Sequence, residues 1–204
     1  MNIAVLGTGS VGRAIAGRLH ELGQDVAVGT RDPQATLART RPDAMGTAPF
    51  ATWHADHADV ALATYADAAA GAENLAGKPL VDISNPLDFS NGFPPSLFVK
   101  DTDSLGEQVQ RQFPEALVVK ALNTLTADLM VHPQTLGASS TVFVSGDDAA
   151  AKATVTDLLT SFGHDDVVDL GGIETARGTE MYLPIWLRLM GALGTAQFNV
   201  KVVR

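Results

Sequence analysis

The chain of 204 residues is long enough for one large domain, or for one domain with a small appendage. Its formal net charge of −9 disfavours nucleic acids and anionic membranes as partners, since both carry negative charge. The sequence contains no cysteine, which excludes disulfides, thiolate metal ligands and cysteine nucleophiles.

The first apolar run, residues 2–6, is not preceded by a basic and apolar leader segment. No stretch of about 18 consecutive apolar residues follows it. We therefore expect a cytoplasmic protein without a membrane span.

From there the chain alternates between short apolar runs, typical of buried strands, and segments with apolar residues at helical spacing. The first pair is a strand over residues 2–6 and a helix over 11–22 that stops at Gly23. Further strands are predicted over residues 25–28, 59–64, 80–83, 117–120, 141–145 and 167–170. Further helices are predicted over residues 36–40, 65–75, 104–113 and 149–162, and loops over 42–49 and 90–95.

The C-terminal part differs from this alternation. Residues 173–198 are apolar and helical in pattern, and one face is expected to carry Met181, Ile185, Leu189 and Leu193. We place a boundary near Gly137, which gives a dinucleotide-binding domain over residues 1–137 and a small C-terminal domain over 138–204. The alternation predicts an α/β fold with a doubly wound, mostly parallel sheet, whose ligands bind at the carboxyl ends of the strands.

A glycine-rich segment follows the first predicted strand and opens the first predicted helix. Its pattern is G-x-G-x-x-G, in which the glycines permit a sharp turn, approach of a pyrophosphate and close packing of helix on strand. The residues expected to surround the pyrophosphate are Gly7, Thr8, Gly9, Ser10, Val11 and Gly12. This context favours dinucleotide binding over a purely structural turn.

The end of the second strand indicates which dinucleotide binds. An NAD site places a carboxylate there for the ribose hydroxyls, but this chain has Gly29 followed by Thr30 and Arg31. A hydroxyl and a guanidinium suit the 2′-phosphate of NADP. The alternative is that Asp32 is an NAD carboxylate, although Asp32 and Pro33 already form a helix start.

Three more strand ends supply candidate cofactor contacts. Ribose and phosphate contacts are expected after the third strand, and contacts to the nicotinamide carboxamide after the fourth and fifth. These candidates are Ala63, Thr64 and Tyr65, then Ser84, Asn85 and Pro86, and finally Asn123. Ser, Asn and Pro also favour turns without any ligand, so a turn remains the alternative at residues 84–86.

The histidines give a weaker signal. His132, before Pro133, is a candidate for proton transfer, although a lone histidine is more often structural. His54 and His57 lie close to Asp56, but their spacing fits no zinc signature, so no metal site is expected. No catalytic side chain is assigned with certainty from the sequence.

At these motifs the sequence resembles the NADP oxidoreductases dependent on coenzyme F420, a deazaflavin hydride carrier. The stretches that carry the resemblance are AVLGTGSVG (4–12), VGTRDP (28–33), DISNP (82–86), KALNT (120–124) and GTAQF (194–198). The similarity spans nearly the whole chain. It departs from the family at residues 63–65, where members usually carry an apolar-Pro-Trp segment.

The resemblance implies an NADP-binding Rossmann domain and a small helical C-terminal domain that close a cleft. NADP would lie along the strand ends and the deazaflavin in the cleft, so that hydride passes directly between carbon atoms. It also implies a homodimer, in which the C-terminal helix forms the dimer face or packs in the core. A flavin, a ferric chelate or another small acceptor, or a non-catalytic NADPH sensor, remain alternatives.

Overall fold

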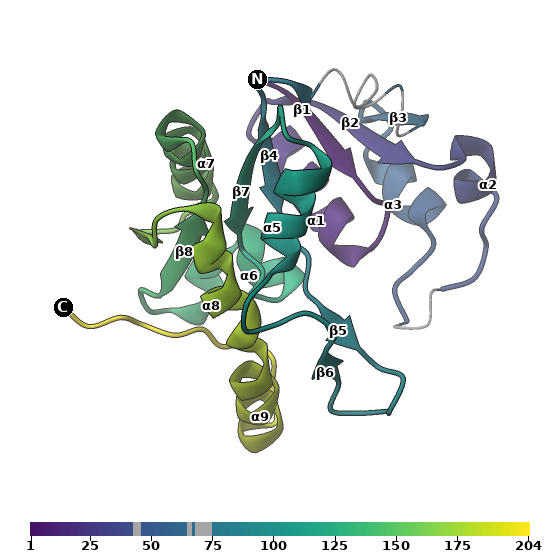
Figure 1. The fold of residues 1–204 in the computed structure, drawn as a ribbon. Coiled ribbons are helices and arrows are strands. Elements are labelled where there is room, and N and C mark those ends of the chain that lie inside the picture. Colours follow the sequence, from purple (N-terminus) through teal and green to yellow (C-terminus); the bar gives the residue numbers. More distant parts are fainter. Residues whose placement is uncertain (43–45, 65–66, 68–74) are drawn as a thin grey trace. The chain divides into compact units, whose positions relative to one another are not determined.

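The computed structural model describes residues 1–42, 46–64, 67 and 75–204 (Figure 1). These residues divide into two compact units, residues 1–74 and 75–204. Each unit is built on its own parallel strand pairs, and each is described by itself below.

The first unit is a parallel sheet in the order β1-β2-β3, accompanied by short helices. Its elements are β1 Asn2–Leu6, α1 Ser10–Glu21, β2 Asp25–Thr30, α2 Pro33–Leu37, α3 Phe50–Asp56 and β3 Ala61–Thr64. Val5, Val26 and Val28 are buried in the strands, and Leu19 of α1 is buried with them. Burial of these apolar side chains stabilises the predicted strand–helix–strand arrangement.

Three local predictions in this unit need correction. Strand β2 runs on to Thr30, because Gly29 and Thr30 pair with Ala63 and Thr64 of β3. Helix α2 begins at Pro33, directly after its cap Asp32, as this pair of residues predicts, but it ends at Leu37 rather than at residue 40. Helix α3 was not predicted; its buried Phe50 follows Pro49 in a segment too short to show a helical period. Most of the helix predicted over residues 65–75 lies outside the described residues.

The second unit contains a four-stranded sheet in the order β4-β7-β8-β9 and a small hairpin of β5 and β6. Its strands are β4 Pro79–Asp82, β5 Leu87–Asp88, β6 Ser96–Leu97, β7 Leu117–Ala121, β8 Thr141–Ser145 and β9 Asp166–Asp169. Its helices are α5 Leu105–Gln112, α6 Ala127–Val131, η2 Pro133–Leu136, α7 Ala149–Phe162, η3 Ile173–Thr175, α8 Ala176–Met181 and α9 Leu183–Leu193.

The α/β prediction is confirmed, with one exception to parallel pairing in the second unit. The pairs β4–β7 and β8–β9 are parallel, whereas β8 is antiparallel to β7 through Lys120–Ser145 and Ala121–Val144. Since β8 belongs to the same sheet as β4 and β7, residues on both sides of Gly137 share one compact unit. The division into functional domains near Gly137 stays a prediction.

Helix α5 joins the sheet to the C-terminal helices. Val118 of β7, Ile173 of η3 and Ala176 of α8 form one buried cluster, with Val109 of α5 packed against it. Ser104 caps the start of helix α5, and its hydroxyl accepts a hydrogen bond from the Glu107 amide at 3.1 Å. This packing positions the start of α5 beside α8.

The helical pattern predicted over residues 173–198 is in fact divided into η3, α8 and α9. Proline at position 184 cannot donate a backbone hydrogen bond and stands at the start of α9, and Gly194, with φ of 66°, ends that helix. Figure 1 shows α9 following α8, and the remaining chain returning as an extended segment to the C-terminus. Of the α9 side chains, Leu183 is buried, and several of its apolar neighbours are exposed.

None of the helices among the described residues combines the length and the apolar character needed to cross a membrane.

Candidate functional site

The glycine-rich segment forms a tight connection between β1 and α1. Gly7 has φ of 136°, a conformation that favours glycine, and its amide donates to the Gly29 carbonyl at 3.0 Å. A side-chain carbon at Gly12 would collide with the Gly7 carbonyl oxygen, whereas one at Gly9 would meet open space. The structure therefore gives Gly7 and Gly12 packing roles and leaves room at Gly9 for a ligand to approach.

The amino terminus of α1 is not capped by a side chain. Gly9 is its N-cap, and the first intrahelical bond runs from the Arg13 amide to the Gly9 carbonyl at 3.0 Å. The amides of the first turn have no acceptor within the helix, and no acidic residue stands there. Such a turn, which includes Ser10, Val11 and Gly12, is suited to an anion. Thr8 lies in the connection that leads to it.

Arg13 is a further cation at this loop that sequence reasoning missed. It is buried, and its Nη1 donates to the Ala48 carbonyl at 2.6 Å, while Nε lies 3.4 Å from the Gly9 carbonyl. The guanidinium thus ties the loop to the chain before α3. Its position directly after Gly12 was the available signal.

The end of β2 separates the roles of three neighbouring residues. Thr30 is buried, and its hydroxyl lies 2.9 Å from that of Thr36. Asp32 caps α2, since its Oδ1 accepts from the Ala35 amide at 2.9 Å. Arg31 is exposed and has no hydrogen bond or ion pair with another described residue. Asp32 is therefore already engaged, and Arg31 is free to receive an anion.

The carboxyl ends of β1, β2 and β3 lie at one edge of a parallel sheet. Gly29 and Thr30 of β2 pair with Ala63 and Thr64 of β3, so the two predicted strand ends are neighbours. Tyr65 lies outside the described residues. The predicted contacts of the first unit thus gather at the edge where ligands bind in such sheets.

In the second unit, three buried charges meet at the ends of β4 and β7. Lys120 is 1% exposed, and its Nζ donates to Asp82 Oδ2 at 2.8 Å and to the Ser84 carbonyl at 2.6 Å. The same Nζ lies 2.8 Å from Oε1 of Glu180 in α8. We call Asp82, Lys120 and Glu180 the charge triad. Sequence analysis did not select its members, because nothing in the linear order brings Glu180 to the other two.

The predicted carboxamide contacts lie beside this triad. Asn85 Nδ2 donates to the Asn123 carbonyl at 2.8 Å, and Asn123 Nδ2 donates to Asn85 Oδ1 at 3.0 Å. Ser84 is exposed and its hydroxyl donates to Asp82 Oδ1 at 2.6 Å, while Pro86 is buried. The structure therefore brings the two asparagines together in one amide pair, which we call the asparagine pair.

The ring nitrogens of His54 and His57 lie at hydrogen-bonding distance from backbone carbonyl groups. His54 Nε2 lies 3.1 Å from the Val60 carbonyl, and His57 Nδ1 lies 2.9 Å from that of Trp53, on which its ring also stacks. These contacts give both residues structural roles. His132 is half-buried and follows α6, and its predicted role in proton transfer stays a prediction.

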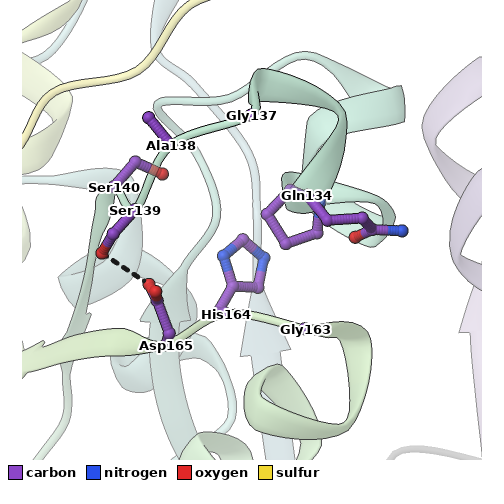
Figure 2. Close-up of a pocket in the computed structure, with 9 residues that line it drawn as sticks. Gln134, Gly137, Ala138, Ser139, Ser140, Gly163, His164 and Asp165 are labelled. Carbon is purple, nitrogen blue, oxygen red and sulfur yellow. Dashed lines mark hydrogen bonds between the residues drawn. The ribbon is translucent and has the colours of Figure 1, made fainter.

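A cavity of about 270 Å³ lies elsewhere in the second unit (Figure 2). It is lined by Gln134, Ser139, His164 and Asp165, among other residues, and by none of the predicted cofactor contacts. His164 Nε2 lies 2.9 Å from the Met130 carbonyl, and burial lowers the pKa of the imidazole below its ordinary value. The ring therefore packs as a neutral group in this wall.

Comparison with known proteins identifies the family of this chain. Residues 2–86 match the family model described as NADP oxidoreductase, coenzyme F420-dependent. The crystal structure of a candidate F420-dependent NADP-reductase from Arthrobacter sp. FB24 is 57% identical and covers all of both chains, with a TM-score of 0.95. The chain belongs to the family of F420-dependent NADP oxidoreductases. The sequence-based identification of this family, and of the enzyme class that it comprises, is confirmed.

Two curated relatives indicate how far the family extends. The F420-dependent NADP reductase of Methanothermobacter marburgensis is 26% identical, over 93% of this chain and 92% of the relative. Metalloreductase STEAP3 of Rattus norvegicus is 30% identical over 90% of this chain, which spans 37% of that relative's length. Both relatives are named as reductases, and they differ in the acceptor that their names state.

Proposed function

We propose that this chain transfers hydride between NADP(H) and a deazaflavin or flavin-type acceptor. The observation that carries the proposal is the uncapped, glycine-lined start of α1 in the same unit as Arg31, a cation without a described counterion. When bound, NADPH supplies the hydride, and the chain binds, orients and shields the reacting rings.

The residues at the start of α1 fit a pyrophosphate. Gly9 leaves open space where a side chain would block an anion, and the first-turn amides can donate to it. Arg13 adds a buried positive charge beside the loop. We propose that residues 7–12 bind the pyrophosphate of the cofactor.

We propose that Arg31 distinguishes NADP from NAD by binding the 2′-phosphate. A guanidinium can donate two parallel hydrogen bonds to a phosphate, and it stays charged at all relevant pH values. Asp32, the alternative ligand for an unphosphorylated ribose, caps α2 instead. Thr30 supports Arg31 by fixing the end of β2 to Thr36.

The remaining strand ends are proposed to bind the rest of the cofactor. Ala63, Thr64 and Tyr65 are proposed contacts for the ribose and adjoining phosphate. The asparagine pair, with Ser84 and Pro86, is proposed to bind the nicotinamide carboxamide, which requires one donor and one acceptor. Asn85 Nδ2 keeps a second N–H for donation and Asn123 Oδ1 keeps lone pairs for acceptance, which match the acceptor and the donor of a carboxamide.

We further propose that the chain acts as a homodimer through α9. Ile185 is 54% exposed and Leu193 is 57% exposed, although both are apolar and lie on a helix of mostly apolar sequence. Exposed apolar surface of this kind favours association. Sedimentation should give a dimer for the native chain and a monomer for Ile185→Asp. The predicted cytoplasmic location stays a prediction.

The acceptor is the test of the proposal. NADPH oxidation should be followed optically with coenzyme F420, FMN, FAD and a ferric chelate, each against NADH as the competing donor. Turnover with F420 or a flavin, and preference for NADPH, are expected. Turnover with the ferric chelate alone would instead indicate that this chain reduces metal ions, the activity named for the metalloreductase relative. Tight NADPH binding without turnover on any acceptor would contradict the proposed reaction.

A further inference from the structure

The charge triad is a fully paired ionic group in the interior of the second unit. Asp82 is 7% exposed, and Lys120 and Glu180 are each 1% exposed. The three N–H bonds of the lysine ammonium match three acceptors, namely Asp82 Oδ2, the Ser84 carbonyl and Glu180 Oε1. A buried charge with this geometry resists displacement, since moving any partner leaves another charge uncompensated.

The second carboxylate of the triad is fixed by a helix terminus as well. Glu180 Oε2 accepts from the Leu105 amide at 2.9 Å, and Oε1 accepts from the Gly106 amide at 3.1 Å. Both amides belong to the first turn of α5, where a negative charge is stabilised. Glu180 therefore locks α8 to α5 and, through Lys120, to β7.

Two arms of the triad end at the asparagine pair. In the first, Asp82 Oδ1 accepts from the Ser84 amide at 2.9 Å while Lys120 binds the Ser84 carbonyl, and Asn85 is the next residue. In the second, Glu180 fixes α8, and the carbonyl of the preceding residue, Thr179, accepts from Asn123 Nδ2 at 3.1 Å. The triad thus fixes Asn85 through its chain neighbour Ser84, and it fixes Asn123 through the carbonyl of Thr179, the chain neighbour of Glu180.

The backbone between Lys120 and Asn123 carries strain that agrees with this role. Leu122 has φ of 59°, in the left-handed region that a branched side chain rarely adopts, and its side chain is buried. Such a conformation is unfavourable by itself and persists where its surroundings impose it. Here it turns the chain so that Asn123 pairs with Asn85 rather than continuing the strand.

We infer that Lys120 and Glu180 are positioning residues that orient the asparagine pair toward the nicotinamide carboxamide of NADP(H). The inference rests on the proposed function. Neither residue touches the cofactor in this scheme. They determine which face of the nicotinamide ring is presented for hydride transfer, because the carboxamide sets the rotation of the ring.

The deciding variant is Glu180→Gln, compared with Glu107→Gln. Both glutamates link α5 to α8, since Glu107 accepts from Arg177 Nε at 2.8 Å, but only Glu180 contacts Lys120. NADPH is titrated into each protein, and its affinity and its dihydronicotinamide emission at saturation are measured together. NADPH that carries deuterium at one or the other C4 position then shows from which face of the nicotinamide ring hydride is transferred during turnover.

Glu180→Gln should bind NADPH within about threefold of the native affinity, because the phosphate contacts remain. The native protein should increase the emission of the dihydronicotinamide when NADPH binds, and Glu180→Gln should lose most of that increase. Turnover of this variant should fall about 10- to 100-fold, and hydride should leave from both faces of the nicotinamide ring. Glu107→Gln should keep native emission and facial fidelity despite its lower stability.

Native emission and fidelity in a folded Glu180→Gln protein would overturn the inference and leave the proposed function intact. If circular dichroism shows that this variant is unfolded, Asp82→Asn, which neutralises the other carboxylate, is measured in the same way and decides the question. Failure of the native protein to bind NADPH would overturn the proposed function, and the inference with it.

Discussion

The two units treat charge at their strand ends in opposite ways. In the first unit, the start of α1 has no capping side chain and Arg31 has no described partner, so polar groups are left ready for an anion. In the second unit, the charge triad is buried and every N–H of Lys120 is used. Groups that bind a mobile ligand must stay unpaired, whereas groups that hold other groups in place must be satisfied.

The largest effect is expected from removing the cation of the buried charge triad. Lys120→Met leaves Asp82 and Glu180 as uncompensated buried carboxylates, and it should lower the free energy of unfolding by about 3–5 kcal/mol. The matched control is Lys152→Met, which breaks a pair with the exposed Asp169 and should cost about 1 kcal/mol or less. Urea unfolding of both variants measures the difference. Equal losses of unfolding free energy in the two variants would show that the ion pairs of Lys120 contribute no more than a pair at the surface.

The open side is tested by filling the space at Gly9. Gly9→Val should fold normally, since a Cβ at this position has no described atom within 4 Å, but it should weaken NADPH binding by about 100-fold by blocking the phosphate. Gly12→Ala is the contrasting variant, because its methyl group collides with the Gly7 carbonyl and should lower stability as well. Calorimetric titration and thermal unfolding separate the two outcomes. Native affinity in Gly9→Val would place the pyrophosphate elsewhere.

A smaller effect is expected from the single cation at the end of β2. Arg31→Ala should weaken NADPH binding by about 10- to 30-fold, as loss of one charge-assisted contact, and leave NADH binding almost unchanged. Arg39→Ala removes another exposed arginine a short distance along the chain and serves as the control. An equal loss of NADH affinity in Arg31→Ala would mean that the guanidinium does not read the 2′-phosphate.

The smallest effect concerns the partly buried ion pair of Glu107 and Arg177, which also joins α5 to α8. Hydrogen bonding from Arg177 holds the pKa of Glu107 below its ordinary value of 4.5. Because the folded pKa is depressed, the pair stabilises the protein above that ordinary value, and the contribution disappears as pH falls through the folded pKa. Glu107→Gln should therefore be less stable by about 1 kcal/mol at neutral pH. The gap to the native protein should close in acid, as urea unfolding at several pH values would show; a constant gap would contradict this.

Local chemistry was enough to predict much of the first unit. The apolar run at residues 2–6, the glycine spacing and the Asp32–Pro33 helix start each act within a few residues, and the structure contains all three. The family followed from these motifs and from the KALNT stretch.

Local signals also sufficed for one helix of the second unit. Helix α7 was predicted to the residue, because its helical period, its cap Asp148 and Gly163 at its end all agree.

The second unit shows what only tertiary structure decided. The sequence offered Asn85 and Asn123 as separate candidates, but their mutual hydrogen bonds depend on β4 and β7 pairing in register. Lys120 reads as an ordinary residue of an apolar strand, and Glu180 as a polar residue of a helix 60 positions further on. Only the packing of α8 against α5 brings the two within 2.8 Å. Motifs that bind backbone to phosphate are local and can be read from sequence, whereas the burial and pairing of charges depend on contacts between distant segments, which the fold alone determines.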